Sequence, residues 1–163
     1  MLPEKATEAS PVVEEQLNIE IRNYSIVNLE ELVTIDQQCF NKYDSYDKKM
    51  FENILKENPN SFFILLVDKT VAGYFIIYRF RKGGYIESIA ILPSFQGMGL
   101  GNYMMEYIIA HFNQLKYKHI TLEVRPTNWK AVRMYEKYGF KAVKTLKNYY
   151  KDGADAILMK KLL

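Results

Sequence analysis

A glycine-rich segment, Pro93–Asn102 (PSFQGMGLGN), carries the strongest chemical signal in the sequence. It follows the apolar, β-branched run Tyr85–Leu92 and precedes an apolar stripe at helical spacing. Glycines allow several backbone N–H groups to turn toward one point, because no Cβ atom stands in the way. The first turn of a helix adds unpaired N–H donors and the positive end of the helix dipole. A strand, loop and helix of this kind suit a pyrophosphate.

Two familiar nucleotide-binding loops fit this segment poorly. A dinucleotide fold needs G-x-G-x-x-G and an acidic residue about 20 positions later. Here the spacing is G-x-G-x-G, and Glu123 stands in the middle of a predicted strand. A P-loop needs Lys and then Ser or Thr after its last glycine, but Asn102 follows Gly101. A glycine-rich turn without any ligand stays open, since short glycine motifs are weak signals.

The elements that must position this loop follow from the hydrophobic periodicity. Apolar alternation and β-branched runs predict strands at 17–22, 61–67, 71–80, 85–92, 120–124, 140–143 and 156–159. Helical spacing predicts helices around 29–35, 51–55, 104–115 and 128–138. Gly83-Gly84 predicts a tight hairpin with positive φ angles, Asn128 a helix N-cap and Gly139 a left-handed C′ residue. The resulting order, β-α-α-β-β-β-α-β-α-β-β, predicts an α/β fold on a mixed sheet.

Composition predicts one globular domain within the 163 residues, which are 48% hydrophobic and 25% charged. We expect a flexible acidic arm over 1–16 and a single domain over 17–163. No apolar run approaches the roughly 20 residues of a membrane span, and no secretory signal is visible. A lone cysteine, Cys39, suits a reducing cytoplasm, where we expect this protein. A net charge of +3 gives no reason to expect nucleic-acid binding, although lysines and arginines gather toward the C-terminus, where they could attract a polyanionic cofactor.

Three segments together resemble the GNAT superfamily of acyltransferases. Gln96-x-x-Gly99-x-Gly101 matches its pyrophosphate motif in the required strand–loop–helix context. The block Leu122–Phe140 (LEVRPTNWKAVRMYEKYGF) and the tail Asn148–Ala156 (NYYKDGADA) are similar to those of N-terminal protein acetyltransferases. The resemblance covers most of the chain from about Tyr85 onward. Within the superfamily, the sequence resembles ribosomal-protein alanine N-acetyltransferases and archaeal and eukaryotic N-α-acetyltransferase catalytic subunits.

The resemblance implies the GNAT fold, a mostly antiparallel mixed sheet flanked by helices, with acetyl-CoA as co-substrate. The loop amides would hold the diphosphate of the cofactor. The strand edge at Ile89, Ala90 and Ile91 would pair with its pantetheine arm, and Asn128 would donate or accept a hydrogen bond to the same arm. The implied cofactor-binding residues are Ile89, Ala90, Ile91, Gln96, Gly97, Met98, Gly99, Leu100, Gly101, Asn102, Asn128 and Tyr135. Gly97 departs from the family, which usually has Arg there, so one cationic contact is missing. No metal is expected, because His111 and His119 are not in ligand spacing.

The resemblance also implies acetyl transfer to an N-terminal α-amino group, in a ternary complex. Glu123 matches the general base, Tyr135 the general acid, and Tyr85 a tyrosine that positions water and the amine. The residues alone leave other roles open: Glu123 could pair with Arg125 or with a lysine on a neighbouring strand, and either tyrosine could simply pack. An α-amine, with a pKa of about 7.7–8.0, needs only a modest base, whereas a lysine amine at about 10.4 costs roughly 4.6 kcal/mol to deprotonate at pH 7.

The expected partner is the N-terminus of a protein or peptide, clamped by Phe40, Tyr43, Tyr149 and Tyr150. Asn41 stands after Phe40, where many relatives have Pro, so the peptide-entry loop departs from theirs. Relatives work alone or with an auxiliary subunit that anchors them to ribosomes. Two alternatives remain: a GNAT enzyme that acetylates a lysine or a small-molecule amine, and a non-catalytic acyl-CoA-binding subunit.

Overall fold

A computed structural model describes residues 16–24, 29–81 and 83–163, so the acidic arm predicted over 1–16 lies almost wholly outside the described residues. The strands are β1 (Ile19–Asn23), β2 (Phe62–Val67), β3 (Thr70–Phe80), β4 (Gly83–Ile91), β5 (His119–Val124), β6 (Lys141–Leu146) and β7 (Ala156–Leu162). The helices are α1 (Leu29–Cys39), α2 (Lys48–Glu57), α3 (Leu100–Gln114) and α4 (Trp129–Lys137), with a 3-10 turn at Pro93–Phe95. The predicted order of elements is confirmed.

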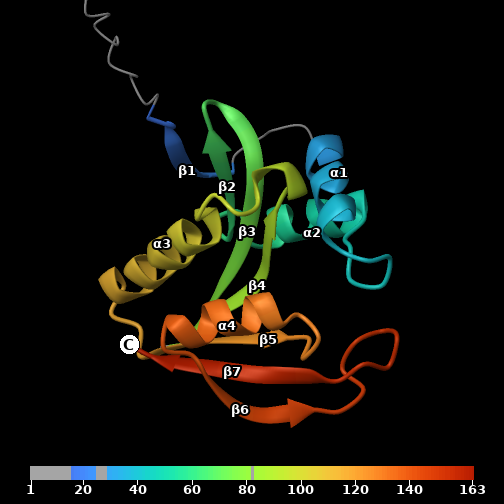
Figure 1. The fold of residues 1–163 in the computed structure, drawn as a ribbon, viewed down its shortest axis with the longest axis vertical. Helices are drawn as coiled ribbons and strands as arrows, with labels where there is room; N and C mark the ends of the chain where they lie inside the picture. The colour runs from blue at the N-terminus through green and yellow to red at the C-terminus, as the bar shows by residue number, and fades with distance from the viewer. Residues whose placement is uncertain (1–15, 25–28, 82) are drawn as a thin grey trace, which may run out of the picture.

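The described strands form one seven-stranded sheet in the order β1-β2-β3-β4-β5-β7-β6. Only β4 and β5 run parallel, and every other neighbouring pair is antiparallel. Helices α1 and α2 cover one face of the sheet and α3 the other, while α4 lies over β5 (Figure 1). Among the described residues, no helix is long and apolar enough to cross a membrane.

Strand β2 explains why its sequence is an unbroken apolar run. All six of its residues are buried, and they alternate between two cores. Phe63, Leu65 and Val67 join the core beneath α3, whereas the alternate residues of β2 join the core beneath α1 and α2. A strand covered by helices on both faces needs no polar side.

The predicted tight hairpin is confirmed, since β3 pairs antiparallel with β4 up to Phe80 and Gly83. Its turn is not at Gly83-Gly84, because both glycines lie inside β4. The positive φ angle belongs to Arg81, at 50°. The glycines are needed for space: a Cβ atom on Gly84 would lie 2.6 Å from the ring of Phe112, and one on Gly83 would lie 2.5 Å from Nε2 of His119. The predicted loop also ends sooner than expected, since Leu100 and Gly101 already belong to α3.

Strands β4 and β5 separate before either of them ends, and this opens the sheet. Their pairing stops at Ile86 and Leu122, although β4 continues to Ile91 and β5 to Val124. The edge of β4 beyond Ile86 therefore faces a gap instead of a neighbouring strand. This part of the strand contains Ile89, Ala90 and Ile91, and it leads directly into the glycine-rich loop.

We expect Gly84→Ala to destabilise the protein by about 1–3 kcal/mol, because the fully buried ring of Phe112 has no room to move away. Chemical denaturation measures this loss. Phe112→Leu provides the matched second variant, since it shortens the obstructing side chain. The double variant should lose less than the sum of the two single losses, and strictly additive losses would show that the contact is not the cause.

Candidate functional site

A cavity of about 460 Å³ occupies the gap between β4 and β5. Its walls come from the loop between α1 and α2, the start of α2, strands β4 and β5, the turn after β5, helix α4 and the loop between β6 and β7. Of the side chains predicted to act, Glu123, Tyr135, Tyr85, Asn128, Ile89, Phe40, Tyr43, Tyr149 and Tyr150 all line it. The fold thus brings together residues that are up to 110 positions apart, from Phe40 to Tyr150.

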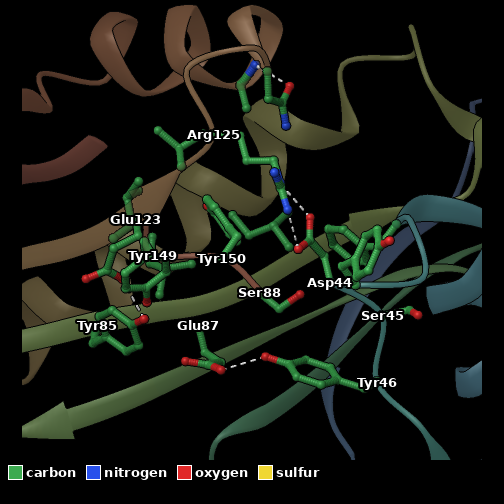
Figure 2. Close-up of a pocket in the computed structure, with 18 of the residues that line it drawn as sticks. Asp44, Ser45, Tyr46, Tyr85, Glu87, Ser88, Glu123, Arg125, Tyr149 and Tyr150 are labelled. Carbon is green, nitrogen blue, oxygen red and sulfur yellow. Dashed lines mark hydrogen bonds and ion pairs between the residues drawn. The ribbon is translucent and has the colours of Figure 1, made fainter. Parts of the chain in front are cut away.

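Glu123 and Tyr85 form a hydrogen-bonded pair across the parting strands. The Tyr85 hydroxyl donates to Oε2 of Glu123 over 2.6 Å (Figure 2). Burial raises the pKa of Tyr85 well above its usual value, and the hydrogen bond to Glu123 and the nearby carboxylates add to this. The phenol therefore stays protonated and keeps donating. Tyr149 also contacts Glu123 and Tyr85, so two tyrosines hold the Glu123 carboxylate in the cavity.

Tyr135 enters the same cavity from α4. It is buried, and its ring packs against Phe140 with the centroids 5.8 Å apart. Burial first, and then the proximity of Tyr150, raises the pKa of Tyr135 to about 12. Its hydroxyl consequently carries a proton throughout the physiological range. A buried phenol that lines a cavity has the properties of a proton donor.

The glycine-rich loop has the conformation that an anion site needs. Gly97 and Gly99 have φ angles of 80° and 79°, in the left-handed region that favours glycine. Gly99 is the N-cap of α3, a helix of 15 residues, so the unpaired N–H groups of its first turn face outward there. Gln96 braces the loop, because its Nε2 donates to the Ile91 carbonyl over 3.0 Å. Of the other predicted loop residues, Met98 is exposed, and the carbonyl oxygen of Asn102 accepts from the Tyr138 hydroxyl.

Asn128 has the predicted capping role. Its side chain accepts a hydrogen bond from the Ala131 amide at the start of α4, and the residue also lines the cavity. The cap uses the side-chain oxygen, which leaves the amide NH₂ as a donor for a ligand. Capping and ligand binding are therefore compatible at this residue.

Arg125 joins two of the cavity's loops, a role that no pattern in the sequence indicates. The guanidinium makes two hydrogen bonds to Asp44, of 2.6 and 2.7 Å, and two longer ones to Asp152, of 3.1 and 3.2 Å. It also lies 3.9 Å from the ring centroid of Tyr150 (Figure 2). These contacts tie the α1–α2 loop to the β6–β7 loop. Since Arg125 binds Asp44 and Asp152, the alternative in which it pairs with Glu123 is wrong.

A second carboxylate, Glu87, also lines the cavity and was not singled out from the sequence. The hydroxyl of Tyr46 donates to its Oε1 over 2.6 Å. Glu87 follows Tyr85 by two residues in a predicted strand, and this spacing was the one available signal. Because residues i and i+2 of a strand share a face, this spacing could have indicated that Glu87 lies near Tyr85.

Comparison with known proteins agrees with this geometry. The model of the acetyltransferase (GNAT) family matches residues 29–140, which is more than half of the chain. The chain belongs to the GNAT family. An N-alpha-acetyltransferase of Saccharolobus solfataricus is 33% identical over 153 residues, covering 85% of this chain and 90% of the relative. A putative [ribosomal protein bS18]-alanine N-acetyltransferase of Bacillus subtilis is 29% identical, covering 85% of this chain and 92% of that protein.

Solved structures show the same GNAT architecture. Ard1 from Thermoplasma volcanium superposes with a TM-score of 0.82 at 27% identity, covering 89% of this chain and 97% of that one. The ribosomal-protein-S18-alanine N-acetyltransferase from Escherichia coli gives a TM-score of 0.79 at 25% identity, covering 89% and 94%. The GNAT fold predicted from the motifs is therefore confirmed.

We expect Arg125→Gln to cost this GNAT protein about 1–3 kcal/mol of unfolding free energy, because it leaves the largely buried carboxylate of Asp44 without its charged partner. Arg22→Gln is the matched control, since its ion pair with Glu20 is far more exposed and should contribute about 0–1 kcal/mol. Urea denaturation gives both values. Hydrogen exchange should also quicken in residues 40–47 and 148–155 in the Arg125 variant alone. Equal losses in the two variants would refute the role of Arg125 in joining the loops.

Proposed function

We propose that this GNAT enzyme, with residues 17–163 as one catalytic domain, transfers the acetyl group of acetyl-CoA to the N-terminal α-amino group of a protein or peptide. The observation that carries the proposal is the Glu123–Tyr85 pair, which shares a cavity with the protonated Tyr135 at the gap between β4 and β5. The relatives named above as N-alpha-acetyltransferases and as ribosomal-protein alanine N-acetyltransferases support the same substrate class.

The residues present fit acetyl-CoA on two observations. Beyond Ile86, one edge of β4 lacks a strand partner, and the peptide-like pantetheine can pair with such an edge at Ile89, Ala90 and Ile91. The left-handed glycines at the start of α3 direct backbone donors to one place, which suits a diphosphate. When bound, acetyl-CoA would supply an activated acetyl group as a thioester. The hydrogen bond from the Gln96 side chain to the Ile91 carbonyl would hold the loop in a fixed position relative to the edge of β4.

Glu123 is the proposed base. It would take a proton from the incoming α-ammonium, directly or through one water, while Tyr85 holds its carboxylate in place. Near pH 7 an α-ammonium is only about 1 kcal/mol from deprotonation, so one carboxylate is sufficient. Tyr135 is the proposed acid, because its phenol keeps the proton that a departing thiolate requires.

The substrate's first backbone atoms would lie between the two loops that Arg125 joins. Tyr149 and Tyr150 meet edge to face, with their centroids 5.1 Å apart, on the β6–β7 side. Phe40 and Tyr43 line the opposite side. We place the reaction in the cytoplasm, where acetyl-CoA and new protein N-termini meet and where the unpaired Cys39 stays reduced. Binding to a ribosome-anchoring auxiliary subunit would bring the enzyme to emerging chains.

The decisive assay supplies acetyl-CoA with peptides that differ in their amines. We expect acetylation of a peptide with a free α-amine, and little acetylation of an N-terminally blocked peptide that contains an internal lysine. Mass spectrometry locates the acetyl group. Acetylation confined to the lysine would overturn the proposal, and acetyl-CoA binding without any turnover would favour a non-catalytic subunit.

Glu123→Gln should lower kcat by about 100-fold while leaving the peptide KM within about threefold, because the amide still accepts from Tyr85 but cannot take a proton. Glu106→Gln is a matched control: it changes another carboxylate bonded to a tyrosine, Tyr138, on the exposed surface away from the cavity. Steady-state kinetics of both variants make the comparison. Unchanged turnover in the Glu123 variant would refute the assignment of the base.

Gly99→Val should weaken acetyl-CoA binding by about tenfold, because a β-branched residue disfavours a φ of 79° and tilts the loop amides. Gly153→Val matches it closely, since Gly153 has a φ of 81° and equally open surroundings. Both variants should lose similar stability. Isothermal titration calorimetry with CoA should show weaker binding only for the Gly99 variant, and equal affinities would show that the loop does not hold the cofactor.

A further inference from the structure

The carboxylate of Glu87 reaches the cavity at a bulge in β4. In the pairing with β3, Ser88 lies opposite Ile76 and Ile86 lies opposite Ile77, which leaves Glu87 without a register partner. The pairing with β5 also ends at Ile86. A bulge redirects a side chain and strengthens the local twist of its strand. Glu87 is therefore at the point where the sheet opens, and its side chain lines the cavity.

The other partner of this contact, Tyr46, is held rigidly. Its hydroxyl donates to Glu87, and its backbone amide donates to Oδ2 of Asp36 over 2.6 Å. Its ring packs edge to face on Phe51, with centroids 5.5 Å apart. Asp36 is fully buried and also accepts a hydrogen bond from the Tyr74 hydroxyl. Because Tyr46 cannot drift, the carboxylate of Glu87 has a fixed position.

Glu87 lies on a different wall of the cavity from Glu123. Tyr85, Glu123 and Tyr149 gather on one side, whereas Glu87 points toward Tyr46 of the α1–α2 loop (Figure 2). If the α-amine meets Glu123 and the backbone lies against the β6–β7 tyrosines, the first side chain must face the remaining wall. That wall consists of the α1–α2 loop, the start of α2 and Glu87, and it includes Phe40 and Met50.

We propose that Glu87 is a specificity-determining residue that selects the side chain of the substrate's first residue. This inference rests on the proposed function. One oxygen of Glu87 receives the Tyr46 hydroxyl, which leaves the second as an acceptor inside the cavity. A first residue with a hydroxyl donor, serine or threonine, gains a charge-assisted hydrogen bond there. An acidic first residue places a second negative charge beside a fixed carboxylate and is rejected.

The test compares three peptides that share every residue after the first and begin with Ser, Ala or Asp. For the full-length enzyme we expect kcat/KM to be about tenfold higher for Ser than for Ala, as a hydrogen bond to a charged group implies. The Asp peptide should be the poorest substrate. Glu87→Met should remove the advantage of Ser over Ala. Glu87→Gln should keep an acceptor but raise activity on the Asp peptide by about tenfold, since the repelling charge is gone.

Three further measurements make the outcome decisive. Tyr46→Phe removes the donor that fixes Glu87, so it should reduce the preference for Ser without touching the carboxylate, and it replaces the Glu87 variants if they fail to fold. Glu106→Gln, whose carboxylate bonds to Tyr138 outside the cavity, should leave all three ratios unchanged. The KM for acetyl-CoA should be unchanged in every variant.

The inference and the proposed function fail in different ways. If the wild-type enzyme acetylates no α-amine, the proposed function is wrong and the inference with it. If the wild type acetylates all three peptides and the Glu87 variants keep its ratios, only the inference is wrong. An equal fall in kcat for every peptide would give Glu87 a catalytic role instead and would also overturn it.

Discussion

The parting of β4 from β5 is the constraint on which the site depends. Two parallel strands that stay paired satisfy each other's backbone groups and leave no room between them. Here the pairing stops at Ile86 and Leu122, and both strands continue. The gap exposes one edge of β4 and admits side chains from helices, strands and loops on either side of it. The cavity is stable because the rest of the sheet and both cores hold the two halves, so the opening costs only a few hydrogen bonds.

The bulge at Glu87 and the ion pairs of Arg125 both act at this opening. The bulge lies where the pairing with β5 ends, and added twist there helps the strands to diverge. Arg125 lies just past the end of β5 and binds two aspartates from loops on opposite sides. Without that guanidinium, the largely buried carboxylate of Asp44 and the more exposed one of Asp152 would repel each other and draw in water. The Arg125 guanidinium therefore links the two loops at the end of the gap between β4 and β5.

Local patterns predicted most of the architecture, and contacts between distant residues explain what they missed. The order of elements, the Asn128 cap and the left-handed Gly139 depend on neighbours in the chain, and all are confirmed. The pair Gly83-Gly84 was assigned to a turn because the sequence does not show why a glycine is needed. A glycine can allow a positive φ angle, or it can leave room for a neighbouring side chain. The space is required by Phe112 and His119, about 30 residues away.

In the candidate site too, the residues that belong to local motifs were predicted, and those defined by contacts between distant residues were not. Residues within family motifs, such as Glu123 and Tyr135, were found from the sequence and lie together in the cavity. Arg125 was visible only as a conventional partner for Glu123, since nothing in the sequence links it to Asp44, 81 positions earlier. Glu87 shares a strand face with Tyr85, but nothing in the sequence links it to its partner Tyr46, 41 positions earlier.

The partners of the two cavity glutamates determine how the site treats an amine. Both Glu123 and Glu87 are held by phenols, and within the described residues neither forms an ion pair. A phenol orients a carboxylate without cancelling its charge, so the cavity keeps a negative potential that attracts an ammonium group. The same potential opposes loss of the proton, because it stabilises the charged form of the amine. An amine whose pKa is already close to neutral overcomes that opposition far more easily than a lysine side chain, which is why this arrangement suits an N-terminus.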